Sequence, residues 1–565
     1  GSRIRPHDGE MLGACSAISQ ELFDGSSPIG ACADMFKRQR RSLGGSLQGG
    51  RSDSESESSS EGESASEGDL FTSEVHVPSF RTRNRRLLTH LKLTRPCILR
   101  ATYAFQPLQS AGEMLRSSHG SAVASGHSED NYYRSFVVGE LNEFWSHSWH
   151  GSPWRKIATL LLYYNTVPAL IVGTCGALCT AAVMHVWFKG DSRNEALFGV
   201  SSMIVGTCSF FLTLVLWRSR RRVFLDKVCI SQADDDLKSE GILSIGGFLR
   251  YSRSMLILWD QSYSSRLWCV FEQAGYYHLR RFDDTKLVHI RPTFQGAMVL
   301  YFAGLLFCYR LLNDLLRYDF SSSCMYSDGV ETMVIPSVSI VVICLPIAHL
   351  IRSAQRDVHA LESQISTFSI REAKCFCCNC NHRHPETGEK IACDRELVES
   401  AVGTWFKSLD NFDYFVRTVV KQNFLVRVGL PYRMALLIAL PAAFEYVGVV
   451  AFQLGHQACD DLLVGEPWGG PMNVFLWVSY MTIRLPLLIE VLVLSAAVFK
   501  KKDVWWAEVL RSMAVAIVTM IWNALTYLAL YTASYWLGHW GCFITVAMMA
   551  CLLYLSIGYG QRMSA

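Results

Sequence analysis

The stretch that decides the fold of the soluble part of this chain is "SMLILWDQSYSSRLWCVFEQAGYYHL", residues 254–279. It opens with a continuous apolar run of strand length between polar residues, a pattern typical of a buried parallel strand. A serine-rich turn follows, and after it apolar residues recur at helical spacing: Leu267, Val270, Phe271 and Ala274. The stretch therefore predicts a buried strand, a short turn and a helix.

The neighbouring sequence repeats this alternation of strand and helix. A short β-rich run at 223–225 ends at Asp226, and apolar residues recur at helical spacing within 239–252. The segment "TKLVHI", residues 285–290, is a further candidate strand. Strands that alternate with helices predict a parallel sheet covered by helices.

A first strand and helix lie upstream, in "NEFWSHSWHGSPWRKIATLLLYYN" at residues 142–165. With this addition the chain resembles the TIR (Toll/interleukin receptor-like) domain, and the match is most specific from Tyr263 to Glu272, in "YSSRLWCVFE". "FWSHSW", "VFLDK" and "SMLILW" match the three strands. The resemblance implies a flavodoxin-like α/β domain in two pieces, 140–165 and 220–291, that self-associates or binds other TIR-like domains in signalling or assembly.

The same resemblance implies a possible enzyme. Some TIR domains hydrolyse NAD at the nicotinamide–ribose bond with a glutamate that Glu272 matches, and a carboxylate can stabilise the oxocarbenium-like ribose. His147, Ser148 and Asp226 follow strands, and parallel sheets bind ligands beyond the carboxyl ends of their strands. We therefore expect these three residues to bind ligand if the domain is catalytic. Many TIR domains only associate as scaffolds, and in that case Glu272 has no catalytic part.

The remainder of the chain is dominated by apolar runs long enough to cross a bilayer, which takes about 20 residues. Basic residues flank these runs on one face, and this indicates that the face and both termini are cytosolic. Eight runs are predicted to span the membrane: 166–188, 195–217, 293–313, 331–352, 434–454, 472–498, 508–533 and 541–560. The first two separate the two pieces of the TIR-like domain, and because two crossings return the chain to the same side, the pieces can meet.

The fold class is therefore a mostly α-helical, multi-pass membrane protein with a small cytosolic α/β domain. Residues 1–130, rich in Ser, Gly and acidic residues, are predicted to be disordered. The formal net charge is +3 with basic and acidic residues intermixed, so nothing indicates nucleic acid as a partner. The partners expected are the lipid bilayer and TIR-like domains.

A cytosolic segment, 353–433, contains a dense cluster of thiols and imidazoles: Cys375, Cys377, Cys378, Cys380, His382, His384 and Cys393. Such a cluster favours a structural zinc ion in tetrahedral coordination, here predicted to use two cysteines of the run with His384 and Cys393. Lipidation of the cysteines and reduced thiols without a ligand are the alternatives.

Two charged residues lie near the middle of predicted spans, Glu445 in the fifth and Arg484 in the sixth. Intramembrane charges normally pair inside a bundle, so we expect an ion pair that serves either a transport pathway or helix packing. Cys324 and Cys459 fall in loops on the opposite side of the membrane, and they can form a disulfide if that side is oxidising.

Overall fold

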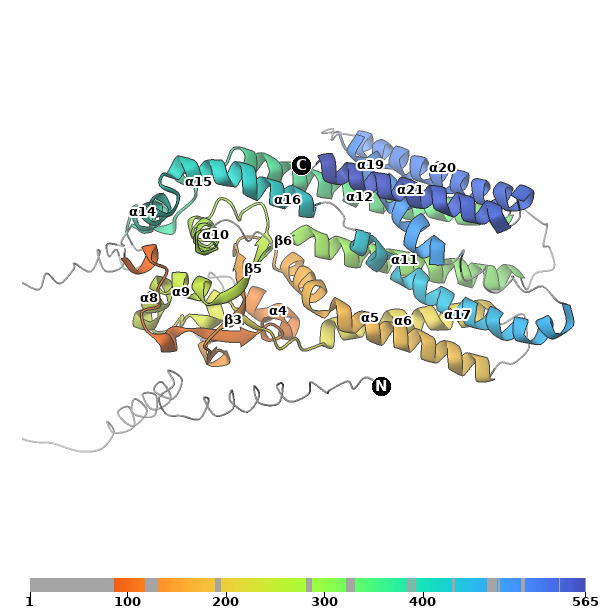
Figure 1. Cartoon of the computed structure of the whole chain (residues 1–565), viewed down its shortest axis with the longest axis horizontal. Helices are drawn as coiled ribbons and strands as arrows, with labels where there is room; N and C mark the ends of the chain where they lie inside the picture. The colour runs from red at the N-terminus through yellow and green to blue at the C-terminus, as the bar shows by residue number, and fades with distance from the viewer. Residues whose placement is uncertain are drawn as a thin grey trace, which may run out of the picture. The chain divides into compact units, whose positions relative to one another are not determined.

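The structure is a computed structural model of the chain (Figure 1). It describes residues 86–116, 131–187, 195–280, 287–321, 331–383, 388, 390, 393–428, 432–464, 475, 478–498, 504–537 and 539–563. The described residues fall into two compact units. Unit 1 takes its residues from Gly1–Thr102, Asp130–Leu141 and Phe224–Ser252, and unit 2 from Tyr103–Glu129, Asn142–Val223 and Arg253–Ala565.

Unit 1 contains short strands and helices that pack around buried apolar side chains. Its elements are β1 (Arg100–Tyr103), β2 (Phe136–Val137), α7 (Asp226–Cys229), α8 (Asp235–Leu243) and α9 (Ile245–Arg250). Strands β1 and β2 are antiparallel, with Arg100 opposite Val137. The single helix expected within 239–252 is divided at Ser244, whose hydroxyl lies 2.9 Å from that of Thr94.

The predicted disorder of residues 1–130 is wrong for residues 86–116. These residues form β1, two 3₁₀ turns and helix α4 (Gln109–Arg116). Ile98, Leu99 and Ala101 are fully buried, so the segment has enough apolar surface to repay the entropy of ordering. The rest of the predicted disordered region, residues 1–85 and 117–130, lies outside the described residues.

The central strands of the sheet are the four strands predicted from the sequence. Strands β4 (Arg222–Phe224), β3 (Leu141–His147), β5 (Ser252–Trp259) and β6 (Val288–Pro292) lie side by side in that order. Strands β5 and β6 are parallel, with Met255 opposite Val288. The predicted strands are thus confirmed, but because β1 and β2 are antiparallel the sheet is mixed and not purely parallel.

Alternation along β3 places this strand between two helices of unit 2. Glu143 and Trp145 bond to tyrosines of α5 (Pro153–Trp187), whereas Ser146 bonds to Glu272 of α10 (Leu267–Leu279). Successive side chains of a strand point to opposite faces. The two faces of β3 are therefore covered by α5 and α10.

Five helices among the described residues are long and apolar enough to cross a membrane. Their apolar parts are Pro153–Trp187, Leu197–Leu216, Thr293–Asp314, Met434–Phe452 and Trp505–Thr526. They belong to α5, α6 (Glu195–Leu216), α11 (Thr293–Ser321), α17 (Tyr432–Val464) and α20 (Trp505–Leu537). The other three predicted spans are also helical, in α12 (Glu331–Ser366), in η8 (Tyr480–Arg484) with α19 (Leu485–Val498), and in α21 (His539–Met563).

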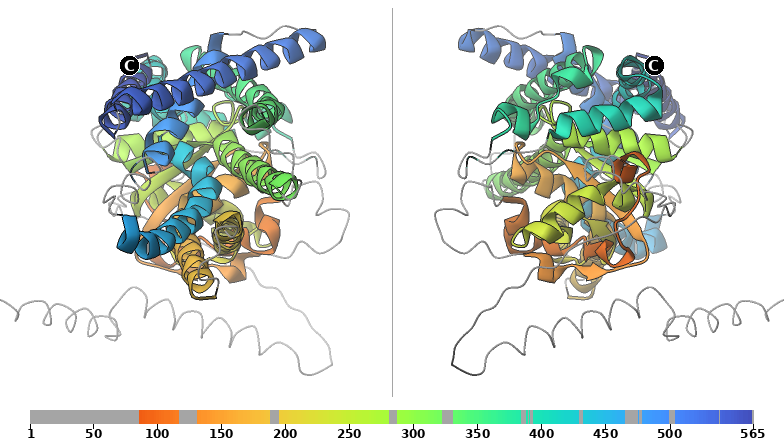
Figure 2. Two further views of the ribbon diagram at one scale, coloured as in Figure 1. Left: turned by 90° about the vertical axis from the view of Figure 1, so that its right-hand side faces the viewer. Right: turned by 90° about the vertical axis from the view of Figure 1, so that its left-hand side faces the viewer.

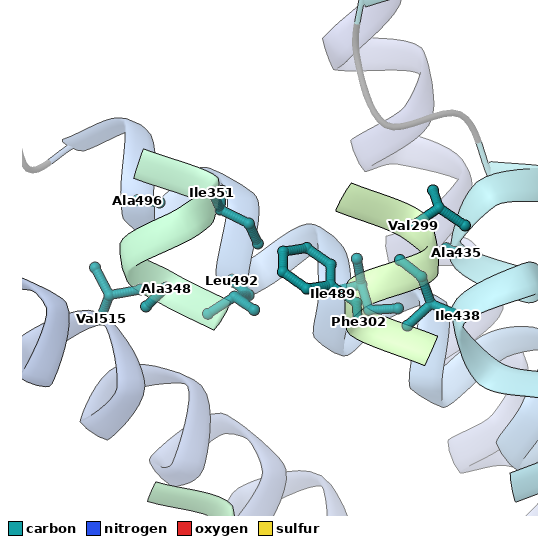
Figure 3. Close-up of a cluster of buried hydrophobic side chains, with 10 residues drawn as sticks. All are labelled: Val299, Phe302, Ala348, Ile351, Ala435, Ile438, Ile489, Leu492, Ala496 and Val515. Atoms are coloured by element: carbon teal, nitrogen blue, oxygen red, sulfur yellow. The ribbon is translucent and has the colours of Figure 1, made fainter. Parts of the chain in front are cut away.

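Apolar side chains from several of these helices meet in one core (Figure 3). The core residues come from α11, α12, α17, α19 and α20: Val299, Phe302, Ala348, Ile351, Ala435, Ile438, Ile489, Leu492, Ala496 and Val515. Helices α5, α6 and α17 lie side by side (Figures 1 and 2). Their apolar side chains form a second core around Phe210 and Phe444. The long apolar segments therefore form a packed bundle.

The cytosolic segment predicted at 353–433 is helical and packs onto α10 and β5. Its helices are α13 (Phe376–Asn379), α14 (Asp394–Phe406), α15 (Leu409–Phe415) and α16 (Lys421–Val428). The ring centroid of Trp405 lies 5.4 Å from that of Phe271, and Phe424 lies 5.5 Å from Trp259. These helices supply a layer of the α/β part of unit 2 that is absent from the predicted TIR-like segments.

Candidate functional site

The predicted pieces on either side of the α5–α6 hairpin meet at Glu272. Ser146 Oγ, near the carboxyl end of β3, donates to Glu272 Oε2 at 2.6 Å and lies 2.8 Å from the hydroxyl of Tyr263. Glu272 is half-buried, whereas Tyr263 is fully buried and its pKa is raised well above the ordinary value by burial. A half-exposed carboxylate is thereby held in a fixed position beside two hydroxyl groups.

Ser148 lies in a second polar group at the carboxyl ends of β3 and β5. Its Oγ is 2.7 Å from that of Ser262, which donates to Asp260 Oδ1 at 2.5 Å. The buried ammonium of Lys156, in the first turn of α5, donates to the carbonyl of Ser148. The position of Ser148 is thus set by strand ends and by the start of α5, and its ligand-binding role stays a prediction.

His147 is buried, and its ring packs edge-to-face on Trp149 with centroids 4.4 Å apart. Its carbonyl accepts from Cys269 Sγ at 3.4 Å. Asp226 belongs to unit 1, where it begins α7 and its carboxylate accepts from the backbone N–H of Lys227 at 2.8 Å. His147, Ser148 and Glu272 belong to unit 2 and Asp226 to unit 1, and the catalytic and ligand-binding roles of all four stay predictions.

Cys269 is buried, and Trp268 packs on Phe271 with ring centroids 5.5 Å apart. Both side chains therefore take part in packing around α10. The indole N–H of Trp268 also donates to Asp394 Oδ2 at 3.2 Å, a contact that the sequence pattern does not indicate.

A second carboxylate besides that of Glu272, namely that of Glu143 in β3, was not identified from the sequence. Glu143 is 1% exposed, and its carboxylate accepts hydrogen bonds from both Tyr163 and Tyr164 of α5. Burial raises the pKa of this carboxyl group, and the tyrosine hydrogen bonds oppose the rise. The signal in the sequence is the strand period, because Glu143 and Trp145 alternate with Phe144 and Ser146.

The Cys/His cluster could hold a metal ion. The Sγ atoms of Cys377, Cys378 and Cys393 and a ring nitrogen of His382 lie within 4.8 Å of one another. Cys375, Cys377 and the carboxylate of Asp394 form an overlapping group. Burial raises the pKa of Cys377 to about 11, and this thiol has to lose its proton to bind a metal.

The predicted ligand set can be compared with the structure only in part. His382 occupies the histidine position of the four-residue group, and Cys380 belongs to neither group. His384, which was predicted as a ligand, lies outside the described residues. The positive φ angles of Asn381 and His382, 51° and 56°, turn the chain back toward the cysteines and bring His382 close to them.

The predicted Glu445–Arg484 pair is wrong. The carboxylate of Glu445 is bonded in bidentate fashion by Arg310 of α11, with Arg310 Nε 2.5 Å from Glu445 Oε2. Arg484 instead donates to the carbonyl and the side-chain oxygen of Asn523, at 3.2 Å and 3.1 Å. Helix α17 lies against α11, so the nearest guanidinium comes from the third predicted span and not from the sixth.

The predicted disulfide cannot be compared with the structure. Cys324 lies outside the described residues, and the side chain of Cys459 is likewise not described. No disulfide joins the cysteines whose side chains the structure describes.

Comparison of the chain with protein-family models, with curated proteins and with solved structures found no match. The resemblance to TIR domains thus rests on the quoted residues, and it stays a prediction.

Proposed function

We propose that this chain is a multi-pass membrane protein whose cytosolic TIR-like domain acts in signalling or assembly by protein–protein association. The observation that carries the proposal is the direct connection between sheet and bundle in unit 2. Helix α5 continues without a break from its contacts with β3 into a segment of membrane length, Pro153–Trp187. Strand β6 likewise runs directly into α11 at Thr293.

The two connections are also bonded to each other. Thr159 Oγ1 of α5 donates to the carbonyl of Thr293 at 3.0 Å. A Cβ added at Gly296 would lie 2.5 Å from the backbone of Thr159, so α5 and α11 touch there backbone to backbone. Two stiff helices joined at the sheet can transmit a displacement between the cytosolic strands and the bundle, as a membrane signalling protein requires.

Association can be measured with the full chain in lipid. Two preparations, one with a donor and one with an acceptor fluorophore at the C-terminus, are reconstituted together in vesicles, and energy transfer is followed as lipid is added. We expect the transfer to persist on dilution, because specific association outlasts random proximity. A decline to the value calculated for randomly placed molecules would contradict the proposal.

A second candidate function, cleavage of NAD, is favoured by the contact between Ser146 and Glu272. Ser146 holds a half-exposed carboxylate at the carboxyl end of β3, where parallel sheets bind ligands. An anion in that position can stabilise the positive charge that develops on ribose as nicotinamide leaves. The proposed roles are charge stabilisation for Glu272 and positioning for Ser146.

The test is nicotinamide release from NAD by the purified full-length protein and its Glu272→Gln variant. Glutamine keeps an oxygen that accepts from Ser146, so the fold is retained while the negative charge is lost. We expect the rate to fall by about 10²–10³-fold. Glu396→Gln, at an exposed position of α14, serves as the control and should keep the full rate. The enzyme hypothesis fails if the wild-type protein releases no nicotinamide or if Glu272→Gln is fully active.

We also propose that the metal of the Cys/His cluster is zinc. Thiolate and imidazole ligands suit zinc, and three cysteines with one histidine are a combination that structural zinc sites use.

A further inference from the structure

The four-residue group has the dimensions of a zinc tetrahedron. Cys377 Sγ lies 4.0 Å from Cys378 Sγ, and Cys378 Sγ lies 3.8 Å from His382 Nε2. Zinc–sulfur bonds of about 2.3 Å at tetrahedral angles separate two ligand atoms by about 3.8 Å. An ion therefore fits among these ligands with only small side-chain adjustments.

The backbone around the cluster supports the same ligands. The N–H of His382 donates to the carbonyl of Cys377 at 2.8 Å, which closes the turn that returns the imidazole to the thiols. The N–H of Asp394 donates to Cys377 Sγ at 3.3 Å. A hydrogen bond to sulfur stabilises a thiolate, the form that binds zinc.

The cluster is attached at both of its ends to the beginning of α10. Lys374, which precedes the first cysteine, donates its N–H to the carbonyl of Ser265 at 2.6 Å and accepts from the N–H of Leu267 at 3.1 Å. Asp394, which follows the last cysteine, accepts from the indole of Trp268 at 3.2 Å. Both ends of a loop closed by one ion are thus bonded to residues 265–268.

We infer that a zinc ion bound by Cys377, Cys378, His382 and Cys393 clamps the start of α10 and so holds in place the helix that carries Glu272. The inference rests on the proposed zinc and does not depend on association or on NAD cleavage. Without the ion, the described residues of the loop between Lys374 and Asp394 keep their backbone hydrogen bonds, the Trp268 contact and the hydrogen bond from Arg395 to the carbonyl of Ala373. A metal ion that closes a loop lowers the conformational entropy of the open loop. Loss of the ion should therefore weaken the hydrogen bonds that attach Lys374 and Asp394 to the start of α10.

The overlapping group of Cys375, Cys377 and Asp394 offers one ligand fewer. Its two sulfur atoms are 3.0 Å apart, closer than two ligands of one tetrahedral zinc ion. A structural zinc site is closed by four protein ligands, which only the group with His382 supplies among the described residues. We therefore place the ion there.

The experiment measures zinc by plasma mass spectrometry in the full-length protein purified in detergent without chelators. We expect about one zinc ion per chain, retained in Cys380→Ser and lost in Cys378→Ser and Cys393→Ser. Each serine variant replaces one sulfur atom of the same loop with oxygen, so Cys380→Ser is a matched control for folding. Retention of zinc in Cys378→Ser together with its loss in Cys375→Ser would overturn the ligand set.

The clamp is tested by hydrogen exchange before and after zinc is removed with a chelator. Peptides that contain Leu267 and Lys374 should exchange faster without the ion, and peptides from β6 should not change. Release of zinc with unchanged exchange at these amides would overturn the clamp. A purified protein that carries no metal would overturn the zinc site. Vesicle energy transfer is scored separately, so failure of the clamp and failure of the proposed association are distinguishable.

Discussion

Replacement of Glu445 by leucine is expected to destabilise the helix bundle by about 3–5 kcal/mol. The variant leaves the guanidinium of Arg310 without its bidentate carboxylate, in a side chain that is only 23% exposed. A guanidinium stays charged in every protein environment, so it cannot escape the cost of burial by losing a proton. The free energy of unfolding can be measured in mixed micelles as the fraction of SDS is raised.

The reciprocal variant and the double variant make this test specific. Arg310→Met leaves a carboxyl group, which can bind a proton and become neutral, so we expect a smaller loss of stability than in Glu445→Leu. The double variant Arg310→Met/Glu445→Leu removes both charges and should recover most of the loss. If Glu445→Leu is as stable as the wild type, the pair is not a structural element of the bundle.

Gly448→Val is expected to separate α17 from α6. A Cβ at Gly448 would lie 2.1 Å from the carbonyl oxygen of Phe198, and the backbone of α6 cannot move aside as a flexible side chain does. Overpacking typically costs about 1–3 kcal/mol and occasionally more, and we expect the upper part of that range because the obstacle is backbone.

Gly304→Ala, in α11, is the control for this prediction, because no other atom lies within 4 Å of its added Cβ. It should leave stability unchanged or raise it by up to about 1 kcal/mol through helix propensity. Unfolding in mixed micelles compares the two variants directly. Equal stability of Gly448→Val and the wild type would show that α6 and α17 do not pack at this glycine.

The strands were predictable because their signals are local. Five consecutive buried residues, Met255–Trp259, form an apolar run that only a covered strand tolerates, and the helix after it has apolar residues at a spacing of three to four. The meeting of β3 with α10 followed from the even number of predicted spans between them. Local pattern and topology together were sufficient for this part of the fold.

Partners of polar residues were not predictable, because they depend on which elements become neighbours. Glu445 and Arg484 lie at comparable depth in consecutive predicted spans, yet α17 places Glu445 against Arg310 of α11. Ser146 was contained in the quoted strand, but only the packing of α10 shows that it bonds to Glu272. In the cysteine cluster, the left-handed residues Asn381 and His382 bring the ring of His382 close to the thiols, and spacing alone does not reveal this turn.

The position of β3 on the far side of the α5–α6 hairpin has a consequence for biosynthesis. The strand leaves the ribosome before α5 and α6, whereas its neighbours β4 and β5 are made after both helices. On the proposed membrane topology, β3 has an open edge with unpaired backbone groups, a template for aggregation, until the hairpin has been inserted as a pair. Completion of the sheet would then report correct insertion of the hairpin, and a chain that inserts only one of the two helices would leave its first strand on the opposite side of the membrane from its partners.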